Sequence, residues 1–294
     1  MSHPAPTSAE YIASLCLHSP QHFPIQLQST AHRLAILNAL HIAPGSRVLE
    51  IGCGQGDCTA ALAALVGEGG HVTAVDPGAL DYGAPATLGQ AQAHISAGPL
   101  GPRITWVQAD PIAFLSSTDE TTTWDVAVLV LCTWYFPTAD TVRATLAALR
   151  ARVRRVCVAE WGLASAAGRG QTHVLAALAQ AALEAHNPAP ESNIRVVVAP
   201  AELKRLAGAA GLALLEESVV EPRENVLDGR WEVGEVVSEG FGERVQTLVR
   251  DERQRGVIVA LRDAVIAGVE RVGGLKNVRS MDVWCAAFGA GHNS

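Results

Sequence analysis

Short apolar runs alternate with helical patterns along most of the chain. The pattern predicts strands at 47–51, 71–75, 103–107, 125–131, 153–160, 212–220 and 281–288. Between them apolar residues recur at helical spacing, which predicts helices at 58–66, 89–97, 138–150, 171–185 and 200–210. Such alternation is typical of a parallel sheet with helices on both faces. The sequence therefore predicts a doubly wound α/β fold.

Two of these strands carry extra information about the sheet. Residues 125–131 are apolar almost without interruption, which indicates a strand buried on both faces. The last strand, 281–288, has no crossover helix after it. We therefore expect it to insert antiparallel, as a hairpin partner of 212–220.

Two segments lie outside the alternation. Residues 8–43 have a helical pattern that ends near Pro44-Gly45, a helix stop signal. Residues 221–280 are polar or helical, with helices expected near 233–250 and 251–271 and a loop at Asn225–Glu232. The predicted organisation is a helical lid at 1–43, a core at 44–220 and 281–290, and a helical cap insertion at 221–280 within the same domain.

Composition and charge narrow the class of protein. The chain has 294 residues, of which 49% are apolar and 17% charged, so a sizeable core is expected and disorder is not. The net charge is −7, which disfavours a dedicated nucleic-acid binder. The densest basic run, Arg150–Arg155, precedes an apolar strand and is typical of a solvated helix end.

The cysteines and the start of the chain bear on its location. The six cysteines form no C-x-x-C pair and no Cys/His spacing typical of zinc, so we expect no metal and buried thiols in a reducing compartment. Met1–Glu10 lacks the apolar stretch of a secretory signal. No run approaches the ~18 apolar residues of a membrane span. These features favour a cytoplasmic protein without a membrane partner.

The candidate binding site begins at a glycine-rich turn. Val48–Asp57 contains an apolar strand, the turn Gly52-Cys53-Gly54-Gln55-Gly56, and the start of a helix. Glycines let the backbone and the helix N-terminus approach a ligand, because no Cβ blocks the way. Glu50 precedes the turn, and Asp76 ends the next strand. This arrangement predicts a nucleoside-type cofactor at the carboxyl edge of the sheet.

With Asp110 at the end of the third strand, the pattern resembles the class I S-adenosylmethionine-dependent methyltransferases. The resemblance covers roughly residues 30–220 and the last strand. A dinucleotide-binding fold competes, but its fingerprint is G-x-G-x-x-G, in which two residues separate the second and third glycines, whereas only Gln55 separates Gly54 and Gly56 here. The resemblance implies S-adenosylmethionine as cofactor and a seven-stranded sheet whose last strand is reversed.

The resemblance also implies roles for single residues. Glu50 would lie near the cofactor's ammonium group or orient the loop, Asp76 would accept from the ribose hydroxyls, and Asp110 from the adenine amine. As alternatives, Glu50 and Asp76 are capping or solvated carboxylates. The full set of expected cofactor-binding residues is Glu50, Gly52, Cys53, Gly54, Gln55, Asp76, Pro77, Asp110, Pro111, Leu131 and Cys132.

The sequence contains fewer motifs that indicate where the methyl acceptor binds. The Asn/Asp-Pro-Pro-Tyr/Phe tetrad, which in this family marks methylation of amines on nucleic-acid bases or of protein glutamine, is absent after the fourth strand. The residues expected to line the acceptor pocket are Trp134, Tyr135, Trp161, Arg230 and Trp231. Core packing is the alternative for the aromatic cluster at 134–136. His173 is the candidate general base, with a solvent-exposed or structurally satisfied histidine as the alternative.

These residues predict a methyltransferase that acts on O, N or C of a small molecule, such as a metabolite or natural product. The alternative is a protein of the same fold that binds the cofactor without transferring a methyl group, in a structural role or as a rearrangement catalyst. A protein or RNA methyltransferase is disfavoured, because no basic surface is evident. The helices of 221–280 are a candidate surface for a homo-oligomer.

Overall fold

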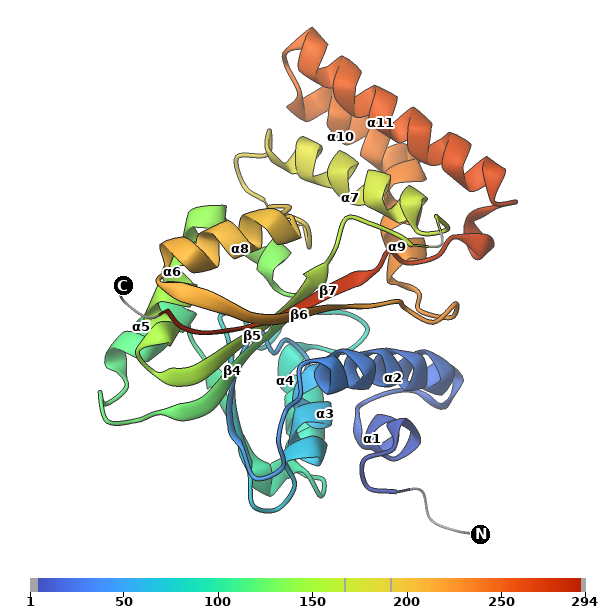
Figure 1. Cartoon of the computed structure of the whole chain (residues 1–294). Coiled ribbons are helices and arrows are strands. Elements are labelled where there is room, and N and C mark those ends of the chain that lie inside the picture. Colours follow the sequence, from blue (N-terminus) through green and yellow to red (C-terminus); the bar gives the residue numbers. More distant parts are fainter. Residues whose placement is uncertain (1–4, 167, 191, 292–294) are drawn as a thin grey trace.

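The fold is built on one mixed β-sheet. The structure, a computed structural model, describes residues 5–166, 168–190 and 192–291. The strands are β1 (Arg47–Ile51), β2 (His71–Asp76), β3 (Ile104–Gln108), β4 (Trp124–Val130), β5 (Val153–Trp161), β6 (Leu212–Val220) and β7 (Val283–Ala290). Their order in the sheet is β3-β2-β1-β4-β5-β7-β6, and Figure 1 labels the strands from β4 to β7. Strands β1 to β5 pair in parallel, and β7 is antiparallel to both β5 and β6. The predicted reversal of the last strand is confirmed.

Alternate residues of the central strands enter two apolar clusters. In β4, Val126 and Val128 pack on one face of the sheet, and Ala127 and Leu129 pack on the other. Only Asp125 is exposed in this strand. The continuous apolar run therefore reflects burial on both faces, as the sequence predicts.

Helices cover both faces of the sheet (Figure 1). One cluster takes side chains from α1, α2, α3, α4 and α7, and the other takes them from α5, α6 and α8. The bounds are α1 (Ala9–Leu15), α2 (Phe23–Ala39), α3 (Asp57–Val66), α4 (Leu88–Ser96), α5 (Pro111–Ser117), α6 (Ala139–Arg150), α7 (Gln171–Glu184) and α8 (Pro200–Ala209). The doubly wound α/β class is confirmed.

Three further helices form the cap: α9 (Asp228–Val237), α10 (Glu239–Leu248) and α11 (Glu252–Arg271). They pack with α7 around a third apolar cluster, and Figure 1 shows α10 and α11 on the side of α7 that faces away from the sheet. We call this group the cap cluster, and its buried members are Ala176, Ala179, Leu183, Val233, Val236, Phe241, Val245, Val249, Ile258, Val265 and Val278.

The cap differs from the prediction in two places. The expected loop at Asn225–Glu232 is only partly a loop, because α9 begins at Asp228. The expected helix at 233–250 is two helices. Ser238 has an extended backbone, and its side chain accepts a hydrogen bond from the Phe241 N–H at 3.1 Å, so it ends one helix and caps the next.

The N-terminal segment packs as part of the core. Of the predicted lid at 1–43, residues 1–4 lie outside the described part. The rest divides into α1, a 3₁₀ turn η1 (Pro20–His22) and α2, because the backbone is extended at Cys16 and Ser19. Helix α2 packs on α3, and its apolar side chains share a cluster with β1. The remaining 3₁₀ turns are η2 (Gly101–Arg103), η3 (Thr133–Tyr135) and η4 (Leu275–Asn277).

Two expectations about the whole chain can be compared with the structure. All six cysteines are buried free thiols, as the sequence predicts. Among the described residues, every helix is too short or too polar to cross a membrane.

Candidate functional site

A cavity of about 650 Å³ opens at the carboxyl edge of the sheet. Its walls come from the segments that follow β1, β2, β3 and β4, together with α2 and the chain before α8. Cavities of this size are typical of small-ligand sites. The lining residues are Arg33, Ile51, Gly52, Cys53, Gly54, Gln55, Asp57, Cys58, Asp76, Pro77, Gly78, Ala79, Tyr82, Leu88, Asp110, Pro111, Val130, Leu131, Cys132, Tyr135, Phe136, Pro137, Thr141, Asn193 and Arg195.

The glycine-rich turn has a backbone that favours glycine. Gly52, Gly54 and Gly56 have φ values of +79°, +51° and +95°. A Cβ on Gly52 would lie 2.6 Å from the Cβ of Cys132, closer than side chains approach. The close approach of the β1 and β4 ends therefore requires glycine at position 52. At Gly54 a Cβ would meet nothing within 4 Å, so the constraint there is the backbone angle.

Asp76 connects the end of β2 to this turn. Its Oδ2 accepts from the Gly54 N–H at 2.8 Å, and its Oδ1 accepts from the Gly78 N–H at 2.7 Å. These two bonds hold the carboxylate at the cavity wall. Each carboxylate oxygen has a second lone pair available for a hydroxyl donor.

Asp110 is held in a different way, as the N-cap of α5. Its Oδ1 accepts from the backbone N–H groups of Ile112 at 2.9 Å and Ala113 at 3.0 Å. Pro111 occupies the first helical position and is buried. The sequence prediction missed this short helix, although Asp followed by Pro is a helix-start signal.

Glu50 lies behind the cavity wall rather than on it. Its side chain is 2% exposed, and the Thr59 hydroxyl donates to Oε2 at 2.6 Å. Burial raises the pKa of Glu50 to about 7. The carboxyl group therefore links β1 to α3, under the glycine-rich turn.

The end of β4 forms the opposite wall. Leu131 has a left-handed backbone with φ +51°, and the Cys132 thiol donates to the Ile51 carbonyl at 3.2 Å. Next come η3 and the segment from Tyr135 to Pro137, which lines the cavity. Tyr135 is 47% exposed, and partial desolvation of its hydroxyl raises its pKa, so the side chain is a phenol at neutral pH.

A buried carboxyl group, Glu160, positions this wall. Its Oε2 accepts from the backbone N–H and the hydroxyl of Thr133, at 2.9 and 2.7 Å. Its Oε1 accepts from the Trp161 N–H at 2.9 Å. Burial raises the pKa of Glu160 to about 7. Glu160 was not predicted from the sequence to have a role, although its place at the end of β5 is a signal for one.

The structure does not bring the candidate base to the cavity. His173 is 0% exposed, and its Nδ1 accepts from the Met281 N–H at 3.0 Å. Burial lowers the pKa of His173 to about 3, so the ring is neutral. It packs edge-on against Trp161, with ring centroids 5.1 Å apart, and His32 stacks on the same indole. His173 and Trp161 therefore lie in the core behind the site.

Three other expected acceptor residues also lie outside the cavity wall. Trp134 is buried and donates to the Val198 carbonyl at 3.3 Å. Arg230 donates to the Lys276 carbonyl at 2.6 Å. Trp231 is 55% exposed on the surface of the cap. Among the predicted acceptor residues, Tyr135 lines the cavity.

The cavity also holds residues that the sequence analysis did not identify. Arg33, Asn193 and Arg195 belong to this group. Arg33 lies in the middle of α2, where its position in a helical pattern resembles that of any solvated arginine. Asn193 and Arg195 follow the proline-rich stretch before α8, which carries no motif.

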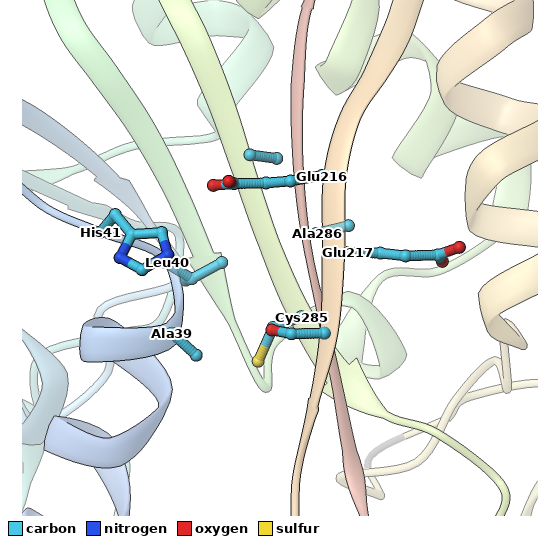
Figure 2. A pocket seen from close by; sticks show the side chains of 9 residues that line it. Ala39, Leu40, His41, Glu216, Glu217, Cys285 and Ala286 are labelled. Atoms are coloured by element: carbon cyan, nitrogen blue, oxygen red, sulfur yellow. The ribbon is translucent and has the colours of Figure 1, made fainter.

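A second cavity lies away from the glycine-rich turn. It has a volume of about 100 Å³ and lies between the end of α2 and strands β6 and β7. Figure 2 shows Glu216 pointing toward His41, while Glu217 points to the other side of β6. Glu216 forms an ion pair with Arg155, and Glu217 accepts from the Trp284 indole at 2.8 Å. The volume of this second cavity is too small for a nucleoside cofactor.

The geometry can now be compared with known proteins. Residues 48–155 match the model of a family described as a methyltransferase domain. This segment contains the glycine-rich turn, Asp76, Asp110 and Cys132, and so most of the cavity wall.

Similarity to individual proteins extends further along the chain. The chain is 31% identical over 290 residues to methyltransferase phomM′ of Diaporthe leptostromiformis, which covers 85% of this chain and 74% of that protein. Methyltransferase phomM of the same organism is also 31% identical, over 288 residues. The solved structure of a cyclopropane-fatty-acyl-phospholipid synthase-like protein from Lactobacillus casei has 31% identity and a TM-score of 0.83, covering 97% of this chain and 100% of that one.

Proposed function

The chain belongs to the class I S-adenosylmethionine-dependent methyltransferases, and from that premise we propose that it methylates a small molecule on oxygen, nitrogen or carbon. The cofactor of this family is S-adenosylmethionine. The observation that carries the small-molecule proposal is the cavity of about 650 Å³, which has room for the cofactor and a compact acceptor.

The chemistry of the cavity wall fits this cofactor. The glycine-rich turn leaves open space at Gly54, where a Cβ would meet no atom within 4 Å, so its backbone can lie against a ligand. Asp76 offers acceptor oxygens suited to two ribose hydroxyls, and Asp110 an acceptor for the adenine amine. When bound, S-adenosylmethionine supplies a methyl carbon activated by the sulfonium charge. We assign these binding roles to Asp76 and Asp110, and the methionine end to the turn and to Leu131 and Cys132.

The protein's own residues would act mainly by orientation. Methyl transfer is an in-line displacement, so its rate depends on alignment of the acceptor atom and on exclusion of water. Tyr135, Phe136 and Pro137 form an aromatic and apolar wall beyond the glycine-rich turn. As a phenol, Tyr135 would donate a hydrogen bond to a polar atom of the acceptor. Glu160 would hold this wall through Thr133.

Two features favour a small acceptor over a macromolecule. The net charge of −7 opposes binding to polyanionic RNA. The acceptor wall is apolar and aromatic, which suits a compact and fairly flat molecule. The name of the structural relative from Lactobacillus casei mentions fatty-acyl phospholipids, so acyl lipids are one class to be tested.

The test is release of S-adenosylhomocysteine from S-adenosylmethionine in the presence of a panel of acceptors. The panel contains small amines, phenols and carboxylic acids, acyl lipids, a peptide library and total RNA. We expect turnover with a small molecule and none with peptide or RNA. The matched variants are Asp76→Ala, expected to weaken cofactor binding by about 10- to 100-fold, and Asp81→Ala on the exposed loop, expected to leave it unchanged.

Two outcomes would contradict the proposal. Turnover only with RNA or peptide would show that the acceptor is a macromolecule rather than a small molecule. Cofactor binding measured by calorimetry, without turnover over the whole panel, would favour the alternative of a methyltransferase-like protein that does not transfer methyl groups.

A further inference from the structure

The stretch before α8 runs across the carboxyl edge of the sheet. Its residues 192–199, which we call the edge segment, form no helix or strand. Ile194 and Val197 pack in the apolar cluster on one face of the sheet. Val196 and Val198 pack in the cluster on the other face. A segment with contacts to both faces passes over the ends of the strands, which is where ligands bind in a sheet of this kind.

Hydrogen bonds to Trp134 fix the edge segment beside the acceptor wall. The backbone N–H groups of Arg195 and Val196 both donate to the Trp134 carbonyl, at 2.9 and 3.1 Å. The Trp134 indole in turn donates to the Val198 carbonyl at 3.3 Å. Trp134 lies in η3, directly before Tyr135 of the cavity wall. The edge segment is therefore held against the part of the cavity that follows β4.

Two polar side chains of the edge segment line the cavity, Asn193 and Arg195. Ile194 between them is 4% exposed and anchors the segment in the core. The Arg195 Nε donates to the Ser192 carbonyl at 3.2 Å, which leaves both terminal nitrogens of the guanidinium available. Within the described part of the chain, Arg195 has no ion-pair partner and the Asn193 amide has no hydrogen-bond partner.

The carboxylates in the described cavity wall are bound elsewhere. Asp76 accepts from two glycine N–H groups, and Asp110 caps α5. Asp57 accepts from a glutamine side chain of α2 at 2.8 Å. Each of them lies more than 4 Å from the guanidinium of Arg195. The acceptor side of the cavity thus contains a cation that an anionic group of a ligand would pair with.

We propose that Arg195, together with Asn193, binds a carboxylate of the methyl acceptor and so orients the reacting atom of that acceptor. This inference deepens the proposed function and rests on it for the presence of an acceptor. A planar guanidinium matches a carboxylate with two parallel hydrogen bonds, and the Asn193 amide offers two further donors. The acceptor is then a compact carboxylic acid with an apolar or aromatic body that lies against Tyr135 and Phe136.

The charge of the protein gives this arginine a further purpose. The net charge of −7 repels an acid at long range, so an acidic acceptor needs a fixed cation at the site itself. Donors on both carboxylate oxygens also withdraw charge from them. The bound carboxylate is therefore the anchor of the acceptor, and the atom that receives the methyl group is another one.

The test compares ligands that differ in the carboxylate alone. The probes are para-hydroxybenzoate, para-aminobenzoate, phenylacetate and hexanoate, each paired with its primary amide. Calorimetry measures the binding of each probe to the protein saturated with S-adenosylhomocysteine. We expect the wild type to bind the acid of at least one pair about 10- to 100-fold more tightly than the amide. Arg195→Met is expected to reduce this preference to less than about threefold and to leave the affinity for S-adenosylhomocysteine unchanged.

Three further variants sharpen the comparison. Arg195→Lys keeps the charge without the fork and should give an intermediate preference, and it takes the place of Arg195→Met if that variant does not fold. Asn193→Asp places a like charge beside the carboxylate and should weaken binding of the acid by about 10-fold or more, with little effect on the amide. Arg154→Met removes an exposed arginine of β5 outside the cavity wall and should keep the full preference.

The outcomes separate this inference from the proposed function. A wild type without preference for the acid in any pair would overturn the inference, as would a preference that Arg195→Met retains. A loss of affinity for S-adenosylhomocysteine in Arg195→Met would place Arg195 on the cofactor side and would also overturn it. The proposed function fails instead if no small molecule is methylated, and the binding comparison stands in that case because it needs no turnover.

Discussion

Two aspartates that follow neighbouring strands have different surroundings at the same edge of the sheet. Asp76 accepts from two glycine N–H groups on separate loops, so it holds the wall of the cavity together. Asp110 accepts from the first turn of the helix that it begins. A cap of this kind satisfies backbone groups regardless of any ligand. Asp110 therefore has a structural role as a helix cap that is independent of its proposed role in binding. A substitution at this position has to distinguish the loss of the cap from the loss of the carboxylate.

Asparagine and alanine at position 110 make this separation. Asparagine caps helices about as well as aspartate, whereas alanine does not cap them. We expect Asp110→Ala to lower the free energy of unfolding by about 0.5–2 kcal/mol and Asp110→Asn to leave it nearly unchanged. Urea denaturation of the three proteins measures this. Equal losses in both variants would show that the carboxylate charge, rather than the cap, stabilises this position.

At the scale of elements, the hydrophobic pattern predicted every strand to within two residues at either end. The signal was strongest for the central strands, which are apolar over nearly their whole length, as β4 is apart from Asp125. Two of the helices that were missed or misjudged, α5 and α9, are short and begin at a cap or in a polar stretch. Their stability comes from packing against α6 and α7, which a local pattern does not contain.

The candidate site was predictable to the extent that it follows strands. The glycine-rich turn, Asp76 and Asp110 stand in fixed relation to β1, β2 and β3, and all of them line the cavity. Arg33 comes to the cavity through the packing of α2 on α3, and Arg195 through a stretch without regular structure. The prediction that His173 lies at the site did not hold for the converse reason. Its place after β5 is close in sequence to the site edge, but the turn of α7 directs the ring into the core.

Glu160, which holds the segment after β4 through Thr133, makes the stability of the folded protein depend on pH. Its pKa of about 7 in the folded protein lies above the ordinary value of 4.5, because burial disfavours the charged form. The folded state therefore binds the proton more tightly than the unfolded state. Its contribution to stability is complete below about pH 4.5 and is lost as the pH rises through about 7.

Glu160→Gln removes this titration and keeps the shape of the side chain. At pH 5 the variant should be less stable than the wild type, since Gln replaces an acceptor oxygen by a donor beside the Trp161 or Thr133 N–H. Between pH 5 and pH 8 this deficit should shrink by about 2–3 kcal/mol, as the wild type acquires a buried charge. Urea denaturation across that range measures the difference. A deficit that stays constant with pH would contradict the assignment.

At the scale of the whole molecule, the apolar interior is divided. Two clusters lie on the faces of the sheet, and the cap cluster joins α7 to α9, α10 and α11. Among the helices in the described part of the chain, α7 alone belongs to both the cap cluster and a sheet cluster. Its Val174 and Ala177 lie in the sheet cluster, and its Ala176 and Ala179 lie in the cap cluster. The cap is thus attached to the sheet mainly through one helix. We expect it to open without unfolding of the sheet.

Phe241 and Phe288 provide a matched pair for testing this division. Both are almost fully buried, Phe241 in the cap cluster and Phe288 on β7 in a sheet cluster. Truncation of either to alanine should cost about 3–5 kcal/mol locally. Phe241→Ala should increase amide hydrogen exchange in α9, α10 and α11 and leave β1, β4 and β5 protected. Phe288→Ala should increase exchange in the central strands as well.

Hydrogen exchange measured by mass spectrometry, with and without S-adenosylhomocysteine, completes this test. The glycine-rich turn and Asp76 lie at the edge of the sheet, away from the cap cluster, so Phe241→Ala should bind S-adenosylhomocysteine within about threefold of the wild-type affinity. Loss of protection in β1 and β4 on truncation of Phe241 would mean that cap and sheet unfold as one unit. The cap helices would then be an integral layer of the fold rather than a unit that opens separately.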